Sequence, residues 1–155
     1  MSNSTIFELK AEQKRLEDRQ KDLDTEVRTA LQSRASMFNI LLIEDSPSDA
    51  IFASNMFNQT GCQVKIEAVR TGAEAVAKLK EFTPDIILLD VNLPKIKGTD
   101  LLPFLMLDAR CRQADIYLIS ASEISDEQLQ VKPKDILTKP LDVETAKRLC
   151  NQCRL

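Results

Sequence analysis

The feature that most constrains the fold is an alternation of short apolar runs and helical patterns after residue 37. The apolar runs occupy residues 38–43, 63–68, 86–89, 115–120 and 135–138. Patterns typical of helices occupy residues 47–60, 71–82, 99–110 and 143–153, with a short helical piece at 126–130. Strands and helices that alternate in this way predict right-handed crossovers and a doubly wound α/β fold with a five-stranded parallel sheet.

The third apolar run shows where chemistry is expected. Residues 86–89 read IILL and lead into Asp90, and a proline at 94 and a glycine at 98 then break the chain. An unbroken apolar run suits a strand that is buried on both faces of a parallel sheet. Ligands of such sheets bind outside the carboxyl ends of the strands, so Asp90 is a candidate functional residue. On this segment alone a simple turn residue is an equally good interpretation, because Asp is common in turns.

Two further acids, Glu44 and Asp45, follow the first apolar run. Because the first and third strands both end in acids, we expect these strands to lie side by side at the topological switch point. Carboxylates that gather at one sheet edge repel each other and therefore favour a bound cation. Ligands that are all oxygen atoms point to Mg²⁺.

The fourth and fifth runs end in a hydroxyl and a cation, Ser120 and Lys139. Acids, a hydroxyl and a lysine at neighbouring strand ends are the groups that phosphoryl transfer to a carboxylate needs. Each residue alone has an ordinary interpretation, a helix cap for Ser120 and a surface charge for Lys139. Their occurrence at strand ends in this order favours the functional interpretation.

From residue 38 to the C-terminus the chain resembles the receiver domains of two-component response regulators. The resemblance rests on IED at 43–45, LLDVNLP at 88–94 with Gly98, SA at 120–121 and KP at 139–140. It covers about three quarters of the chain. It implies a flavodoxin-like fold that accepts a phosphoryl group from a histidine kinase or a histidine phosphotransfer protein. The division that we expect is a helical segment at 1–37 and a receiver domain at 38–155.

The resemblance also implies a magnesium site. Asp45 and Asp90 match the carboxylate ligands of Mg²⁺, and Asn92 matches the residue that lends its backbone carbonyl. Glu44 matches the acid that acts on the metal through water.

For the phosphoryl group itself, Asp90 matches the acceptor, Lys139 the phosphate-binding lysine and Ser120 the switch hydroxyl. Because the matching proline of the family usually follows a cis peptide bond, the bond between Lys139 and Pro140 is expected to be cis.

The chain departs from the family where its signal is usually transmitted. Ile136 stands at the position of the switch aromatic, and Tyr117 on the fourth strand is not an assured replacement. The stretch between Ser120 and Lys139 is shorter than usual and contains Pro133, so the fourth helix of the family is expected to be truncated or irregular.

Residues 5–35 contain neither proline nor glycine and predict a long helix with a heptad pattern. One core position is strongly apolar and consists of Leu9, Leu16, Leu23, Ala30 and Met37; the other is mixed and consists of Ile6, Gln13, Gln20, Val27 and Arg34. We expect a homodimer through this segment. Docking on the same chain or on another protein, and a mobile tail, stay open. A parallel pair would oppose Arg19 to Asp24 but also Glu12 to Glu17, so the orientation is also open.

Composition limits the remaining possibilities. The net charge of −3 argues against a nucleic-acid binder, and the chain has neither a membrane-length apolar stretch nor a signal-peptide pattern, so we expect a cytoplasmic protein. Histidine is absent, which excludes a Ser-His-Asp triad and a histidine-bearing zinc site. Cys150 and Cys153 have redox or metal spacing but no partner pair, and ordinary thiols explain them better.

The interpretation that follows is a phospho-accepting receiver without a separate output domain, which signals to an unknown downstream protein or through pairing of its helix. An alternative is a constitutive coiled-coil scaffold whose receiver site is little used. A phosphatase with an aspartyl nucleophile is disfavoured, because Asn92 stands two residues after Asp90 where a general acid would be needed.

Overall fold

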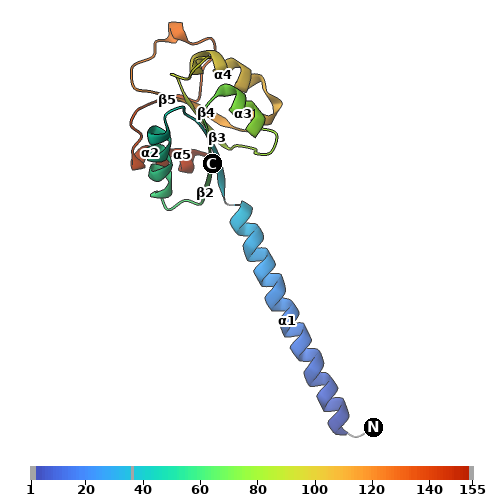
Figure 1. Ribbon diagram of the computed structural model, residues 1–155. Coiled ribbons are helices and arrows are strands. Elements are labelled where there is room, and N and C mark those ends of the chain that lie inside the picture. Colours follow the sequence, from blue (N-terminus) through green and yellow to red (C-terminus); the bar gives the residue numbers. More distant parts are fainter. Residues whose placement is uncertain (1–2, 36, 154–155) are drawn as a thin grey trace. The chain divides into compact units, whose positions relative to one another are not determined.

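A computed structural model of the chain describes the backbone of residues 3–35 and 37–153, and the side chains of residues 4–28 and 37–152. The chain divides into two compact units, residues 1–36 and residues 37–155. The first unit contains one helix, α1 (Asn3–Ala35). The second contains a sheet with its covering helices (Figure 1).

The sheet has five parallel strands, as the alternation of apolar runs and helices predicts, and their order is β2-β1-β3-β4-β5. The strands are β1 (Phe38–Ile43), β2 (Val64–Val69), β3 (Ile86–Asp90), β4 (Asp115–Ser120) and β5 (Asp135–Thr138). The α-helices of this unit are α2 (Pro47–Asn58), α3 (Gly72–Lys78), α4 (Gly98–Leu107) and α5 (Val143–Cys153). Two short 3₁₀ turns, η1 (Ala109–Cys111) and η2 (Asp126–Gln128), complete the unit. This is the flavodoxin-like, doubly wound arrangement, and the predicted fold class is confirmed.

The register of β1 and β3 positions the acidic strand ends. Ile43 pairs with Leu89, so Glu44 and Asp90 follow in adjacent strands at the same edge. The two strands are neighbours although β2 separates them in the sequence, and the switch point therefore lies between them, as predicted.

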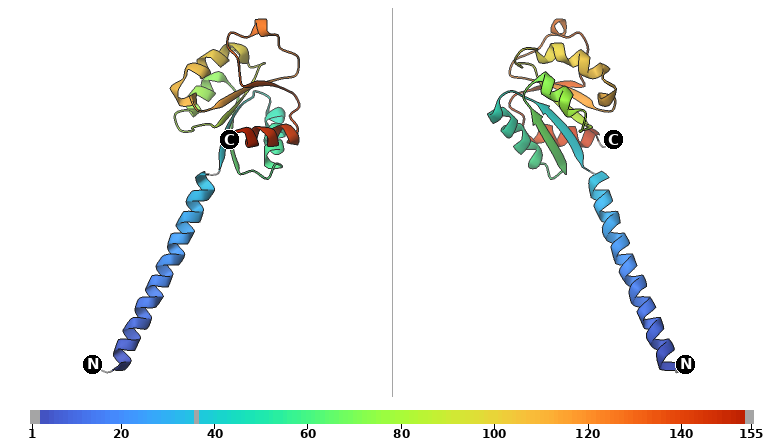
Figure 2. Two further views of the ribbon diagram at one scale, coloured as in Figure 1. Left: turned by 180° about the vertical axis from the view of Figure 1, so that it is seen from behind. Right: turned by 45° about the vertical axis from the view of Figure 1, so that its right-hand side comes forward.

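Two apolar layers sandwich the sheet, because alternate side chains of each strand point to opposite faces. Figure 2 shows α3 and α4 on one face and α2 and α5 on the other. The first face packs Leu79, the residue that caps the end of α3, and Leu102 of α4 on the sheet. The second packs Phe57 of α2 and Leu149 of α5. All five residues of β3 are buried, which explains its unbroken apolar sequence.

Local signals set the helix ends. The side chain of Ser46 accepts a hydrogen bond from the backbone of Asp49, and Pro47 occupies the first turn of α2, as predicted. Three predicted helices are too long. The expected helix at 47–60 ends at Asn58. The expected helix at 71–82 ends at Lys78 and continues as a turn, and the one at 99–110 begins at Gly98 and ends at Leu107.

The segment between β4 and β5 lacks a full helix and contains only the three residues of η2. Its apolar side chains Ile124, Leu129 and Val131 still pack against the first core cluster. A short connection that includes Pro133 therefore covers the sheet as an irregular strap, which confirms the expected loss of the fourth helix.

Helix α1 exposes every side chain that is described in it, residues 4–28. Its apolar residues are exposed too, namely Ile6, Phe7, Leu9, Leu16, Leu23 and Val27. The side chains of Ala30 and Arg34, which complete the predicted heptads, lie outside the described residues. A helix gains most of its stability from packing an apolar face, so we expect α1 to need a partner surface. Within the described residues, no helix has both the length and the apolar character to cross a membrane.

Candidate functional site

The acids predicted from three positions lie together at the carboxyl edge of the sheet. One carboxylate oxygen from each of Glu44, Asp45 and Asp90 lies within 4.8 Å of the others. Glu44 and Asp90 are buried, while Asp45 is half-buried. The parallel register of β1 and β3 is sufficient to produce this cluster.

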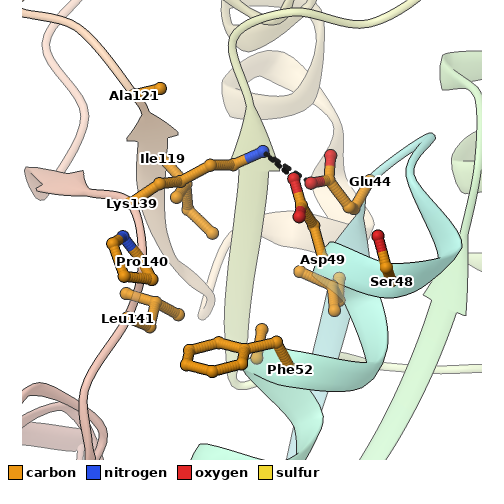
Figure 3. Close-up of a pocket in the computed structure, with 11 residues that line it drawn as sticks. Glu44, Ser48, Asp49, Phe52, Ile119, Ala121, Lys139, Pro140 and Leu141 are labelled. Atoms are coloured by element: carbon orange, nitrogen blue, oxygen red, sulfur yellow. Dashed lines mark hydrogen bonds and ion pairs between the residues drawn. The ribbon is translucent and has the colours of Figure 1, made fainter.

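Lys139, which follows β5, reaches across the strand ends into this cluster (Figure 3). Its Nζ atom lies 2.5 Å from Oε1 of Glu44 and 3.3 Å from Oδ2 of Asp90. The same ammonium donates to Oδ2 of Asp49 in the first turn of α2, at 3.1 Å. The sequence did not single out Asp49, because an acid in a first helical turn already has an explanation as a capping residue.

Burial and the neighbouring charges shift the pKa values of Glu44 and Lys139. Burial, then the contact with Asp90, raises the pKa of Glu44 to about 8. Burial alone would lower the pKa of Lys139, but the carboxylates of Glu44, Asp49 and Asp90 outweigh it and raise that pKa. Lys139 therefore stays protonated, and a single lysine leaves the cluster with surplus negative charge.

One carboxylate oxygen of Glu44 accepts no hydrogen bond from the described residues. Its Oε2 atom is buried and has no hydrogen-bond partner within the part of the chain that the structure describes. A buried, unpartnered carboxylate oxygen is costly, and a cation removes both this cost and the repulsion between the acids. Ligands that are all oxygen atoms suit a hard divalent cation such as Mg²⁺, so the residues present fit that ion. In the described parts of the chain, this is the only cluster of three or more candidate metal ligands.

The backbone holds Asp90 in place. Its Oδ1 atom accepts a hydrogen bond of 3.1 Å from the backbone N–H of Asn92. The N–H of Gly98 donates to the carbonyl of Val91 at 2.8 Å. A Cβ atom at position 98 would collide with the carbonyl oxygen of Asp90, so only glycine lets α4 begin this close to the strand end.

Ser120 ends β4, one strand away from Asp90. It is buried, and its Oγ atom accepts a 3.2 Å hydrogen bond from the N–H of Ser122. Its carbonyl accepts from the N–H of Lys139 at 2.8 Å, which ties the ends of β4 and β5 together. The peptide bond between Lys139 and Pro140 is cis, as expected.

Ile136, at the position of the switch aromatic, and Tyr117, its possible replacement, lie on opposite faces of the sheet. Ile136 is half-buried and packs against the first core cluster. Tyr117 belongs to the second cluster, is 1% exposed and donates from its hydroxyl to Oε1 of Gln152. Tyr117 is thus a core residue, and it does not replace an aromatic side chain at position 136.

A cavity of about 530 Å³ opens beside the acidic cluster, between α2 and the segment after β5. Figure 3 shows Lys139, Glu44 and Asp49 at one end of it and Phe52, Pro140 and Leu141 at the other. No pattern in the sequence predicts this cavity, because its walls come from segments that are far apart in the chain.

The cysteine pair lies only partly within the described residues. Cys150 is fully buried in the second core cluster, which agrees with the interpretation of this residue as an ordinary buried thiol. The side chain of Cys153 lies outside the described residues.

Comparison with known proteins agrees with the fold and the site. The family model of the response regulator receiver domain matches residues 40–151. The chain therefore belongs to the response regulator receiver family, whose domains serve signalling rather than conventional enzyme catalysis.

Individual relatives match over most of their own length. Protein PilH of Pseudomonas aeruginosa is 27% identical, over 74% of this chain and 96% of that protein. The chemotaxis protein CheY of Bacillus subtilis is 26% identical, over 73% of this chain and 94% of that protein. The crystal structure of a two-component response regulator from Legionella pneumophila has a TM-score of 0.68 and is 27% identical, over 76% of this chain and 98% of that one.

Proposed function

We propose that this chain accepts a phosphoryl group on Asp90 from a histidine kinase or a histidine phosphotransfer protein. The observation that carries the proposal is the position of Lys139, whose ammonium lies between the carboxylates of Asp90 and Glu44. That ammonium lies where it can neutralise an oxygen of a phosphoryl group on Asp90.

The transfer requires little proton chemistry from the chain. An oxygen of Asp90 attacks the phosphorus of phosphohistidine, the P–N bond breaks, and the imidazole nitrogen leaves with its electron pair. The product is an acyl phosphate on Asp90. Asn92 orients Asp90 through its backbone N–H, and Lys139 stabilises negative charge on the phosphoryl oxygens.

Mg²⁺ held by Asp45, Asp90 and the backbone carbonyl of Asn92, with Glu44 acting through water, would supply further neutralisation of those oxygens. The surplus negative charge and the unpartnered Oε2 of Glu44 support this ligand set.

The output that we propose is a change in protein contacts. The acyl phosphate carries about two negative charges where the carboxylate of Asp90 carried one, one strand away from Ser120. Movement of the Ser120 hydroxyl toward the new group would pull on the irregular strap between β4 and β5. Helix α1 supplies a second contact surface, and we propose that it pairs two copies of the chain.

Intact mass spectrometry after incubation with acetyl phosphate and Mg²⁺ tests the phosphoacceptor. One added phosphoryl group on the native chain and none on Asp90→Asn is the expected result. Asp100→Asn is a matched control, because this acid is exposed in the first turn of α4. A folded native protein that gains no mass under these conditions would refute the proposal.

One observation favours a second function, a constitutive scaffold. Ile136 stands at the position of the switch aromatic and packs against the first core cluster. The strap that follows Ser120 also lacks a full helix through which a change at Ser120 could be transmitted. Light scattering with and without beryllofluoride, which mimics the acyl phosphate, separates the two functions. A change in mass or shape supports the switch, whereas bound beryllofluoride without any change supports the scaffold.

A further inference from the structure

Helix α1 carries a stripe of exposed apolar side chains at heptad spacing. Between 43% and 60% of the surface of each is exposed in Ile6, Leu9, Leu16, Leu23 and Val27. We propose that this stripe binds the same stripe of a second copy in antiparallel orientation. In the proposed register the numbers of two facing core residues add up to 29, so that Ile6 of one helix faces Leu23 of the other. This inference rests on the proposed pairing of α1 and adds its direction and register.

The register overlaps the stripes of the two helices over residues 6–23. Ile6 of one helix faces Leu23 of the other, while each remaining leucine faces a glutamine, Leu9 with Gln20 and Leu16 with Gln13. Two-fold symmetry repeats each layer, so the overlap covers four of the five side chains of the stripe on each helix. Only Val27 of the stripe falls beyond it.

Charge complementarity selects this arrangement. The residues that flank the core meet across the antiparallel seam as Glu12 with Arg19 and Lys10 with Glu17, each pair twice. All four contacts are therefore attractive, and the charges belong to side chains that the structure describes as exposed.

A parallel pair and a shifted antiparallel pair have less favourable charge contacts. A parallel pair would oppose Arg19 to Asp24 twice but would also oppose Glu12 to Glu17 twice, so attraction and repulsion balance. An antiparallel pair shifted by one heptad would bring Glu17 against Glu17 and Arg19 against Arg19. Like charges at such positions oppose association.

The two glutamines in the seam fit the same arrangement. Gln13 donates from its amide to Glu17 at 3.3 Å, and Gln20 donates to Asp24 at 3.1 Å, both within their own helix. A glutamine that faces a leucine of the partner needs its amide bonded in its own helix. In a parallel pair each glutamine would face its own copy and would not need these bonds.

Sedimentation of the full chain over a range of concentrations at low salt tests the inference with charge reversals. Glu17→Lys would turn both Lys10–Glu17 contacts of the dimer into contacts between two lysines and is expected to weaken dimerisation roughly tenfold. The swap Lys10→Glu with Glu17→Lys is expected to restore it. High salt is expected to remove most of the difference.

Asp24→Lys is the matched control, because it makes the same charge change and also removes a glutamine–acid bond within the helix. In the antiparallel register residue 24 faces no charged residue, so this variant loses only the bond to Gln20 and is expected to weaken dimerisation clearly less than Glu17→Lys does. Circular dichroism checks that all variants keep the same helix content.

Two results would overturn the inference. Stronger dimerisation of Glu17→Lys together with weaker dimerisation of Asp24→Lys would establish a parallel pair. A native chain that stays monomeric at every concentration would refute pairing altogether. Neither result bears on phosphorylation of Asp90, which intact mass reports independently.

Discussion

The two units of this chain use their apolar residues in opposite ways. The receiver unit buries leucines such as Leu102 completely between sheet and helices, whereas α1 holds leucines such as Leu16 with 60% of their surface exposed. The receiver therefore specifies its structure through its own core. Helix α1 leaves its apolar surface exposed, and under the proposed pairing the same residue type would serve folding in one unit and recognition in the other.

The strongest test of this difference is to replace one leucine by alanine in each unit. Leu102→Ala is expected to lower the unfolding free energy of the receiver by about 3–4 kcal/mol, because it leaves a cavity in a packed core. That loss corresponds to a fall in Tm of roughly 10 °C or more, measured by calorimetry. Leu16→Ala is expected to leave this Tm within about 2 °C and to weaken dimerisation instead. Equal effects on Tm would mean that α1 contributes to the receiver core.

Two glycine substitutions test whether the close contact between Gly98 and Asp90 is needed for phosphorylation or only for folding. Gly98→Ala is expected to cost about 3 kcal/mol and to abolish phosphorylation, because its methyl group would push on the backbone of Asp90. Gly61→Ala is the control, since Gly61 has a φ of 80° and open space around it. It is expected to cost about 1 kcal/mol through backbone strain and to phosphorylate normally. Normal acetyl phosphate labelling of Gly98→Ala would show that Asp90 tolerates the displacement.

Magnesium should distinguish the units by acting on one only. A concentration of 100 times Kd is expected to stabilise the receiver by about 2.7 kcal/mol, through binding to the native state alone. Asp45→Asn is expected to lose this gain, yet to be at least as stable as the native chain without Mg²⁺, because one repulsive charge is gone. Thermal scans with and without the ion measure both effects. An Mg²⁺ response that survives Asp45→Asn would place the ion elsewhere.

Exposed ion pairs are expected to matter least. In the receiver the side chain of Arg110, then the backbone N–H of Arg110, lowers the pKa of Asp108 to about 2. Because the pKa is lower in the folded state, any stabilisation is present above pH 4 and is lost as the pH falls toward 2. An NMR titration of Asp108 should give this low value, and Arg110→Gln should return it toward 3.8, with no measurable change in Tm at pH 7. An unchanged pKa in that variant would assign the shift to another cause.

The strands were predictable because each buried strand shows itself as an apolar run, and the adjacency of β1 and β3 was predictable because both end in acids. The runs at 38–43, 115–120 and 135–138 match β1, β4 and β5 in both bounds. The ends of α3 and α4 were less predictable, since a helical pattern continues into turns that still bury apolar residues such as Phe82 and Cys111.

Within the site, sequence reasoning identified the residues that stand at strand ends, because strand order alone brings them together. It missed Asp49, whose carboxylate reaches Lys139 from a helix, and the close approach of Gly98 to Asp90. Contacts of these kinds depend on how a helix is set against the sheet, and no periodicity of residue types records that. The roles of Glu44, Asp45, Asp90, Asn92, Ser120 and Lys139 in phosphoryl transfer stay predictions for the experiments above.

The burial of Tyr117 has a practical consequence. It is the only tyrosine of a chain without tryptophan, and it lies on β4 three residues before Ser120. Its intrinsic fluorescence therefore comes from a single place, the packing between β4 and α5. The molecule thus carries its own optical reporter of events at the end of β4, which needs no label and gives no signal from α1.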